Sequence, residues 1–147
     1  VAKAVEVLAA QADEAPVDAE RIAALGFCFG GTAVLELARD GSEVAGVVSL
    51  HGGLSTPLPA KDDAVRTSIL VLNGADDRGV TDEDIAGFER EMDAAGADWQ
   101  FVNFSGAVHC FAEADANSPP GCVYNERAAT RAFEMTHDFL RERFAAE

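Results

Sequence analysis

The sequence predicts an α/β fold in which a parallel sheet of about four strands is flanked by helices, within a single domain over residues 1–147. Short apolar runs alternate with helical patterns along the chain, which is typical of strands joined by crossover helices. Several of these runs are continuous, as in parallel strands that are covered on both faces. The connections are therefore expected to be right-handed crossovers.

The N-terminal half is expected to hold two helices and two strands. Val5, Leu8 and Ala9 recur on one face of the first helix. Gly41 stands where the second helix should end, as glycine commonly does. The predicted elements are a helix over 2–11, a polar linker over 12–20, a strand over 21–27, a helix over 32–39 and a strand over 44–50.

The C-terminal half repeats this alternation. Thr81 precedes "DED", so it is expected to cap a helix that runs to about Ala95 and ends at Gly96. The other predicted elements are strands over 68–73 and 98–104, a long loop over 105–122 and a final helix over 125–144.

Charge and composition exclude some partners. The 26 acidic residues against 11 basic ones give a net charge of −15, so a nucleic-acid partner is not expected. The apolar runs are far shorter than the ~20 residues that a membrane helix needs, so no membrane partner is expected either. No signal-peptide pattern opens the sequence, which favours a cytoplasmic protein.

The three cysteines also favour the cytoplasm. Cys28, Cys110 and Cys122 form an odd set without CxxC spacing, so neither a zinc site nor a disulfide framework is expected. A bridge between Cys110 and Cys122 remains open on spacing alone. The sequence predicts no metal and no cofactor.

Three residues that can carry chemistry follow three predicted strands. Cys28 comes directly after the first strand, Asp77 soon after the third and His109 soon after the fourth. The carboxyl ends of parallel strands meet at one edge of a sheet, where ligands bind. Each residue alone has an ordinary structural explanation, but their order of nucleophile, acid and histidine is that of the α/β-hydrolases. We therefore expect a catalytic triad.

The glycines around Cys28 fit a nucleophile elbow, a sharp turn between strand and helix. Side chains at positions 26 and 30 are expected to collide across the turn, so Gly26 and Gly30 avoid that collision. Gly31 would let helix and strand pack closely. Cys28 would lie at a helix N-terminus, which favours thiolate, and the Phe29 N–H would support an oxyanion.

Other residues compete for these roles or extend the site. Asp76 is an alternative acid, although the G-x-x-D spacing and a following valine favour Asp77. His137 falls within the predicted last helix and is a weaker candidate for the base. His51 and Gly52 belong to an "HGG" turn that follows the nucleophile, so we expect this turn to line the site with Phe29 and Gly30 as oxyanion or substrate-binding residues.

The motifs "GFCFGG", "NGADDRGV" and "FSGAVHCFAE" resemble those of the dienelactone hydrolases, the cysteine-nucleophile branch of the α/β-hydrolases. The spacings of 49 residues from Cys28 to Asp77 and 32 from Asp77 to His109 are similar too. The resemblance implies that these three residues hydrolyse small esters or lactones through a thioacyl-enzyme, promiscuously and without metal or cofactor.

The resemblance covers only the C-terminal part of that fold, so we expect an α/β-hydrolase fold truncated at the N-terminal side. The strands that would precede the match, a second oxyanion donor and a glutamate that contacts the resting cysteine in the family are not matched. The strand before Cys28 would then be a sheet edge with unpaired backbone groups. We expect a homodimer to cover it, by domain swapping or by edge pairing.

Two other functions compete with an ester or lactone hydrolase. A fold fragment or interaction module could keep the three residues without an assembled site. A thioesterase or amidase could use the same scaffold and the same nucleophile.

Overall fold

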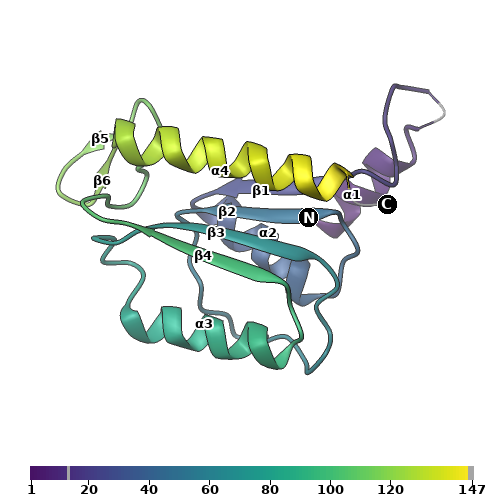
Figure 1. Ribbon diagram of the computed structural model, residues 1–147, viewed down its shortest axis with the longest axis horizontal. Coiled ribbons are helices and arrows are strands. Elements are labelled where there is room, and N and C mark those ends of the chain that lie inside the picture. The colour runs from purple at the N-terminus through teal and green to yellow at the C-terminus, as the bar shows by residue number, and fades with distance from the viewer. Residues whose placement is uncertain (13, 146–147) are drawn as a thin grey trace.

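The computed structural model describes residues 1–12 and 14–145 (Figure 1). The predicted linker over 12–20 contains Asp13, which lies outside these residues. The described residues form these elements in chain order: α1 (Ala2–Ala9), β1 (Ala23–Phe27), α2 (Phe29–Arg39), β2 (Gly46–Leu50), β3 (Ser68–Gly74), α3 (Asp82–Ala94), β4 (Trp99–Phe104), β5 (Asn117–Ser118), β6 (Cys122–Val123) and α4 (Glu126–Ala145).

The four long strands form one parallel sheet in the order β1-β2-β3-β4, which confirms the predicted fold class. Leu25 of β1 pairs with Val48 of β2, and Val48 with Leu70 of β3. Figure 1 shows α4 over one face of the sheet and α2 and α3 over the other. All four strands run the same way, so their carboxyl ends lie at one edge of the sheet.

Two apolar cores lie on the two faces of the sheet, because successive strand residues point to opposite sides. Val47 and Ile69 pack with Leu35 of α2 and Phe88 of α3. On the other face the core combines strand residues with residues of α4, and it contains Val48, Leu50, Leu70, Leu72, Phe111, Ala128 and Ala132. Burying each such leucine or valine stabilises the fold by about 1.5–3 kcal/mol.

Strand β1 lies at the edge of the sheet, as the sequence predicts. Leu25 in its centre is 40% exposed. Phe133 of α4 lies beside Phe27 of β1, with 6.2 Å between ring centroids, and is itself 38% exposed. This partly uncovered apolar border is the surface on which the expected homodimer depends, and the dimer stays a prediction.

Helix α2 begins at Phe29, three residues earlier than the sequence predicts. The Thr32 N–H donates to the Cys28 carbonyl oxygen at 3.2 Å, so the first helical turn closes directly on the cysteine. Two consecutive glycines argue against a helix on propensity alone, but the tight turn from β1 fixes their conformation. Among the described residues, no helix is both long and apolar enough to cross a membrane.

Candidate active site

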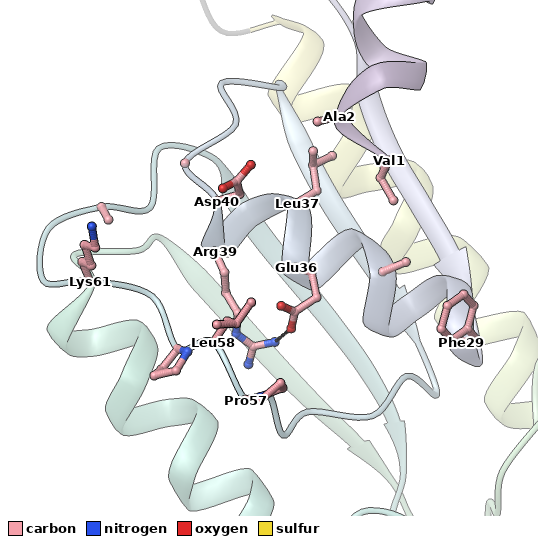
Figure 2. Close-up of a pocket in the computed structure, with 14 residues that line it drawn as sticks. Val1, Ala2, Phe29, Glu36, Leu37, Arg39, Asp40, Pro57, Leu58 and Lys61 are labelled. Atoms are coloured by element: carbon pink, nitrogen blue, oxygen red, sulfur yellow. Dashed lines mark hydrogen bonds and ion pairs between the residues drawn. The ribbon is translucent and has the colours of Figure 1, made fainter.

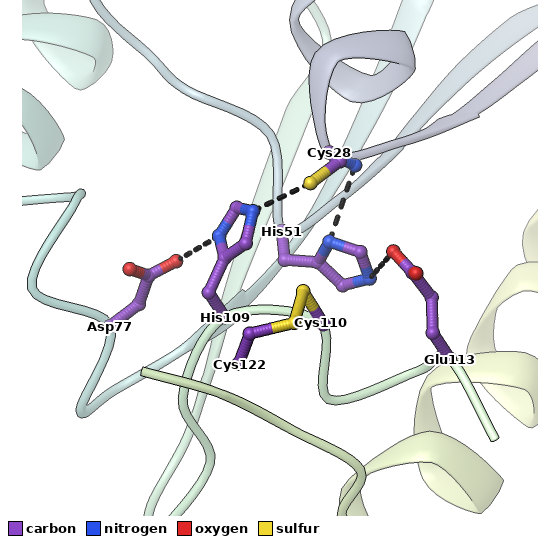
Figure 3. Close-up of a disulfide and its surroundings, with 7 residues drawn as sticks. All are labelled: Cys28, His51, Asp77, His109, Cys110, Glu113 and Cys122. Carbon is purple, nitrogen blue, oxygen red and sulfur yellow. Dashed lines mark hydrogen bonds and ion pairs between the residues drawn. A yellow bond between two sulfur atoms is a disulfide. The ribbon is translucent and has the colours of Figure 1, made fainter. Parts of the chain in front are cut away.

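The carboxyl edge of the sheet brings together the three residues expected to form a triad (Figure 3). Cys28 follows β1, Asp77 lies in the turn after β3, and His109 lies in the loop after β4. The Asp77 N–H donates to the Gly74 carbonyl oxygen at 3.0 Å, which closes that turn and buries the aspartate. Asp76, the alternative acid, is exposed.

The three side chains form a continuous relay. Cys28 Sγ lies 2.6 Å from His109 Nε2, and His109 Nδ1 lies 2.7 Å from Asp77 Oδ2. Asp77 also accepts a hydrogen bond from the Gly79 N–H at 2.8 Å, which holds its carboxylate in place. With a proton on Nδ1, the Nε2 atom of His109 faces the sulfur as an acceptor. The arrangement can therefore take a proton from the thiol and return it to a leaving group.

Cys28 has the strained backbone of a nucleophile elbow, with φ 55° and ψ −123°. A Cβ at Gly26 would lie 2.1 Å from the Gly30 carbonyl oxygen, so no side chain fits there. A Cβ at Gly31 would lie 2.7 Å from Ser49 Oγ, which accounts for the close packing of α2 on β2. The steric expectation for Gly30 is wrong, because a Cβ there would meet nothing within 4 Å.

The residues expected to line the site lie around the first turn of α2. Phe29 is the first residue of that helix, so its N–H belongs to the turn that has no partner within the helix. The Phe29 side chain is 85% exposed. Gly52 is buried, and a Cβ on it would lie 2.7 Å from the Thr32 nitrogen. Contacts of Phe29, Gly30 and Gly52 with a substrate stay predictions.

His51 follows β2 and contacts both Cys28 and His109, whereas the sequence predicts only that it lines the site. It is completely buried, and its Nδ1 atom accepts a hydrogen bond from the Cys28 N–H at 3.2 Å. Burial, and next the charge of His109, lower the pKa of His51 to about 4, although Asp77 acts in the opposite direction. The ring is therefore neutral at neutral pH. His137, by contrast, lies exposed on α4.

Glu113 is the residue that the sequence reasoning missed. Its Oε1 atom lies 3.8 Å from His51 Nε2 (Figure 3), and its carboxylate lies within 4.8 Å of Cys28 Sγ. It stands in the motif "FSGAVHCFAE", four residues after His109, but a single glutamate in a loop gives no signal of its own. Its role depends on the fold of this loop.

Cys110 and Cys122 form a disulfide, which answers the question that their spacing left open. Cys28 is free. The Val123 N–H donates to the His109 carbonyl oxygen at 3.1 Å beside the bridge. The disulfide thus joins the loop that carries His109 to the small β5–β6 sheet.

Two groups of side chains near Cys28 have the composition of metal ligands, namely Cys28 with His109 and Cys110, and Cys28 with His51 and Glu113. Cys110 is oxidised in the disulfide, so the first group lacks a third thiolate or imidazole. In the second, His51 Nδ1 accepts from the Cys28 N–H, which leaves the proton on Nε2, the atom that faces Glu113. Neither group is arranged to bind a metal.

Two cavities reach residues of the site, one at Phe29 and one at Asp77. One of about 920 Å³ runs along the outer surface of α2 and reaches Phe29 (Figure 2). Its polar wall includes Arg39, which is paired with Glu36 and Glu91. Another of about 690 Å³ is lined by Asp77 and its turn. Cys28 is not among the residues that line either of these two cavities.

Comparison with known proteins identifies the family of this chain. The model of the dienelactone hydrolase family matches residues 1–144. An uncharacterized protein of Caenorhabditis elegans is 35% identical over 138 residues, which are 88% of this chain and 84% of that protein.

Two solved structures are similar in both fold and sequence. A dienelactone hydrolase-like promiscuous phosphotriesterase from metagenomic libraries is 36% identical, with a TM-score of 0.84 over 92% of this chain. A protein named m3DLH is 35% identical, with a TM-score of 0.83 over 97% of this chain. The matches span only 57% and 62% of those two chains, so both solved proteins contain a large part that has no counterpart here.

Proposed function

Because this chain belongs to the dienelactone hydrolase family, we propose that it hydrolyses small carboxylic esters or lactones with Cys28 as the nucleophile. The observation that carries the proposal is the relay from Cys28 Sγ through His109 to Asp77, with contacts of 2.6 and 2.7 Å. A nucleophile bonded to a base that is itself oriented by a carboxylate is the arrangement that covalent acyl transfer requires.

In the proposed mechanism His109 Nε2 takes the Cys28 proton while the sulfur attacks the ester carbonyl carbon. The carbonyl oxygen becomes an oxyanion, which the Phe29 N–H supports. The carbon–oxygen bond to the alcohol breaks, and His109 returns the proton to the departing oxygen. Water, deprotonated by His109, then attacks the thioacyl carbon, releasing the acid and restoring the thiol.

Phe29 is the oxyanion donor that we assign among the described residues, and with this donor alone we expect a modest rate. Loss of one such donor costs about 2.7–4 kcal/mol in other hydrolases, or roughly 100- to 1,000-fold in rate. The cavities that reach Phe29 and Asp77 lie next to the proposed nucleophile and its base, and they support activity on several small activated substrates rather than on one.

The direct test is a burst assay with p-nitrophenyl acetate, together with mass spectrometry of the acylated protein. We expect one acetyl group per chain on Cys28, and none in Cys28→Ala. His109→Ala should slow acylation strongly, whereas His137→Ala, on the exposed side of α4, should not. Equal acylation rates in these two histidine variants would contradict the mechanism.

Phosphotriesters are a second class of substrate to test, because the chain is 36% identical to a promiscuous phosphotriesterase. Cys28 would attack phosphorus, the aryloxide would leave, and water would cleave the phosphorus–sulfur bond. Paraoxon should then leave a diethylphosphoryl group on Cys28 that His109→Ala does not form. A stable adduct without turnover would limit the activity to carboxylic esters.

The competing functions are separated by reactivity and by substrate class. An inactive fragment or interaction module would leave Cys28 no more reactive towards iodoacetamide than a small free thiol. A thioesterase or amidase would cleave acyl thioesters or p-nitroanilides faster than the matching p-nitrophenyl esters. Our proposal requires the opposite order.

We also propose that a second copy of the chain covers the exposed β1 edge. What supports this is the position of β1 at the edge of the sheet and the exposure of Leu25 and Phe133. Light scattering should give twice the mass of one chain at micromolar concentration, and Leu25→Lys should lower it. A compact monomer at that concentration would exclude the dimer.

A further inference from the structure

A second histidine contacts the nucleophile from a side that the relay does not use. The Cys28 N–H is shared between the Leu50 carbonyl oxygen at 3.1 Å and His51 Nδ1 at 3.2 Å. The first acceptor completes the ladder between β1 and β2. The second acceptor belongs to His51, whose side chain is fully buried and has no role in the mechanism proposed above.

Both residues of this contact have unusual backbones. Among the described residues, four other than glycine have positive φ, and Cys28 at 55° and His51 at 40° are two of them. Positive φ costs free energy in such residues and persists only where the surroundings impose it, which is common at functional sites. Here the two strained residues hold each other through one hydrogen bond at the point where β1 turns into α2.

The protonation state of His51 follows from its neighbours. Because Nδ1 accepts from the Cys28 N–H, the proton of the neutral ring lies on Nε2. That atom is buried without a hydrogen-bond partner, and Glu113 Oε1 lies 3.8 Å away. The titratable groups around the ring are Cys28, Asp77, His109 and Glu113. Burial keeps the pKa of His51 low, so the Nδ1 lone pair is available at neutral pH.

His51 also supports the base. Its ring meets the His109 ring edge-on, with 5.3 Å between centroids, and packs at the same distance against Phe111. The buried His51 ring therefore contacts both Cys28 and His109.

We propose that His51 is a positioning residue, which accepts the Cys28 N–H to hold the sulfur against His109 and is itself oriented by Glu113. The proposal rests on Cys28 being the reactive thiol. It predicts that the reactivity of Cys28 depends on the acceptor atom of residue 51, and not only on the volume of its side chain.

Two variants of similar size separate these possibilities. His51→Asn keeps an acceptor near the position of Nδ1, and asparagine tolerates positive φ. His51→Leu removes the acceptor. The first readout is the rate at which iodoacetamide alkylates Cys28, which needs no esterase activity. The second readout is kinetics with p-nitrophenyl acetate. The acylation rate is normalised to the concentration of titrated thiol, and KM is measured in the same assay.

We expect His51→Leu to slow both reactions by roughly tenfold, the equivalent of one buried hydrogen bond, with little change in KM. His51→Asn should stay within about threefold of the native rates, and His137→Leu should match the native protein. Native alkylation rates in a folded His51→Leu protein would overturn the proposal. So would equal losses in the Leu and Asn variants.

Glu113 provides a test that does not depend on the folding of His51→Leu. Glu113→Gln keeps a polar oxygen near the Nε2–H group of His51, whereas Glu113→Leu does not. We expect alkylation of Cys28 to slow in Glu113→Leu and to be preserved in Glu113→Gln. Equal rates in these two variants would contradict the orienting role. If alkylation follows the predictions but no ester is turned over, the proposed function fails and the positioning role stands.

Discussion

His109 Nδ1 lies 2.7 Å from Asp77 Oδ2, although 32 residues separate them in the chain. The contact fixes which nitrogen of His109 faces Cys28, and it joins the turn after β3 to the loop after β4. A neutral amide in place of the carboxylate would favour the wrong tautomer.

Asp77→Asn should therefore lower the acylation rate by about 10²–10⁴-fold with little loss of stability. Asp76→Asn is the matched control, because Asp76 is the exposed neighbour in the same turn. Single-turnover acylation of both variants checks this. A larger loss in the Asp76 variant would assign the acid role to that residue instead.

Gly26 and Gly30 should differ sharply in their tolerance of a methyl group. Gly26→Ala places a Cβ 2.1 Å from the Gly30 carbonyl oxygen, so the elbow must move, and we expect a loss of more than about 2 kcal/mol. Gly30→Ala meets no atom within 4 Å and stands in a helix, so it should be neutral or stabilising by up to about 1 kcal/mol. Urea unfolding of the two variants measures the difference.

The disulfide should support the position of His109 rather than take part in the chemistry. Cys122→Ser or reduction frees the loop that follows His109, which slows acylation and lowers the free energy of unfolding. A 12-residue separation predicts a stabilisation of about 3 kcal/mol from the bridge. Denaturant unfolding and burst kinetics, each with and without reductant, test this, with Cys122→Ser as the variant that reductant should no longer affect.

The stability of the fold should fall in acid partly because of His51. The pKa of this residue is about 4 in the folded chain and about 6.5 in an unfolded one, so the unfolded state binds a proton first as the pH falls between these values. From pH 7 to pH 5 this costs about 2 kcal/mol. His51→Asn should flatten the profile in that window. A parallel profile for the variant would mean that other groups cause the loss.

Arg39 and Glu91 form a buried ion pair that connects α2 to α3. Arg39 Nε and Nη2 donate to the two carboxylate oxygens, each at 2.9 Å. Burial works to raise the pKa of Glu91, but the hydrogen bonds from Arg39 and the Ala60 N–H outweigh it, so the pKa lies below its usual value. The pair therefore stabilises the fold above about pH 4.5 and is lost as the pH falls through the lowered value.

Glu91→Gln leaves the buried Arg39 charge with the partly exposed Glu36 as its remaining carboxylate partner, so we expect a loss of up to about 3 kcal/mol at pH 7. The double variant Arg39→Met/Glu91→Met should recover most of that stability, because it removes both charges. Thermal and urea unfolding of the single and double variants checks this. Additive losses in the double variant would show that the pair does not act as a unit.

Hydrophobic periodicity and glycine placement were sufficient to predict the four long strands, the four helices and the parallel sheet. The small β5–β6 sheet was not predicted, because strands of two residues are too short to show hydrophobic periodicity. The start of α2 was misplaced for a related reason. The helix propensity of Gly30 and Gly31 is poor, and the tertiary turn at Cys28 overrides it.

The sequence by itself determined which residues stand at the carboxyl ends of the strands, because strand order and residue type can be read from local pattern. Cys28, Asp77 and His109 were found in this way. The tertiary structure alone decided that His51 and Glu113 also face the nucleophile, and that Cys110 meets Cys122. Such contacts depend on backbone angles and side-chain directions that many residues impose together, and no local pattern records them.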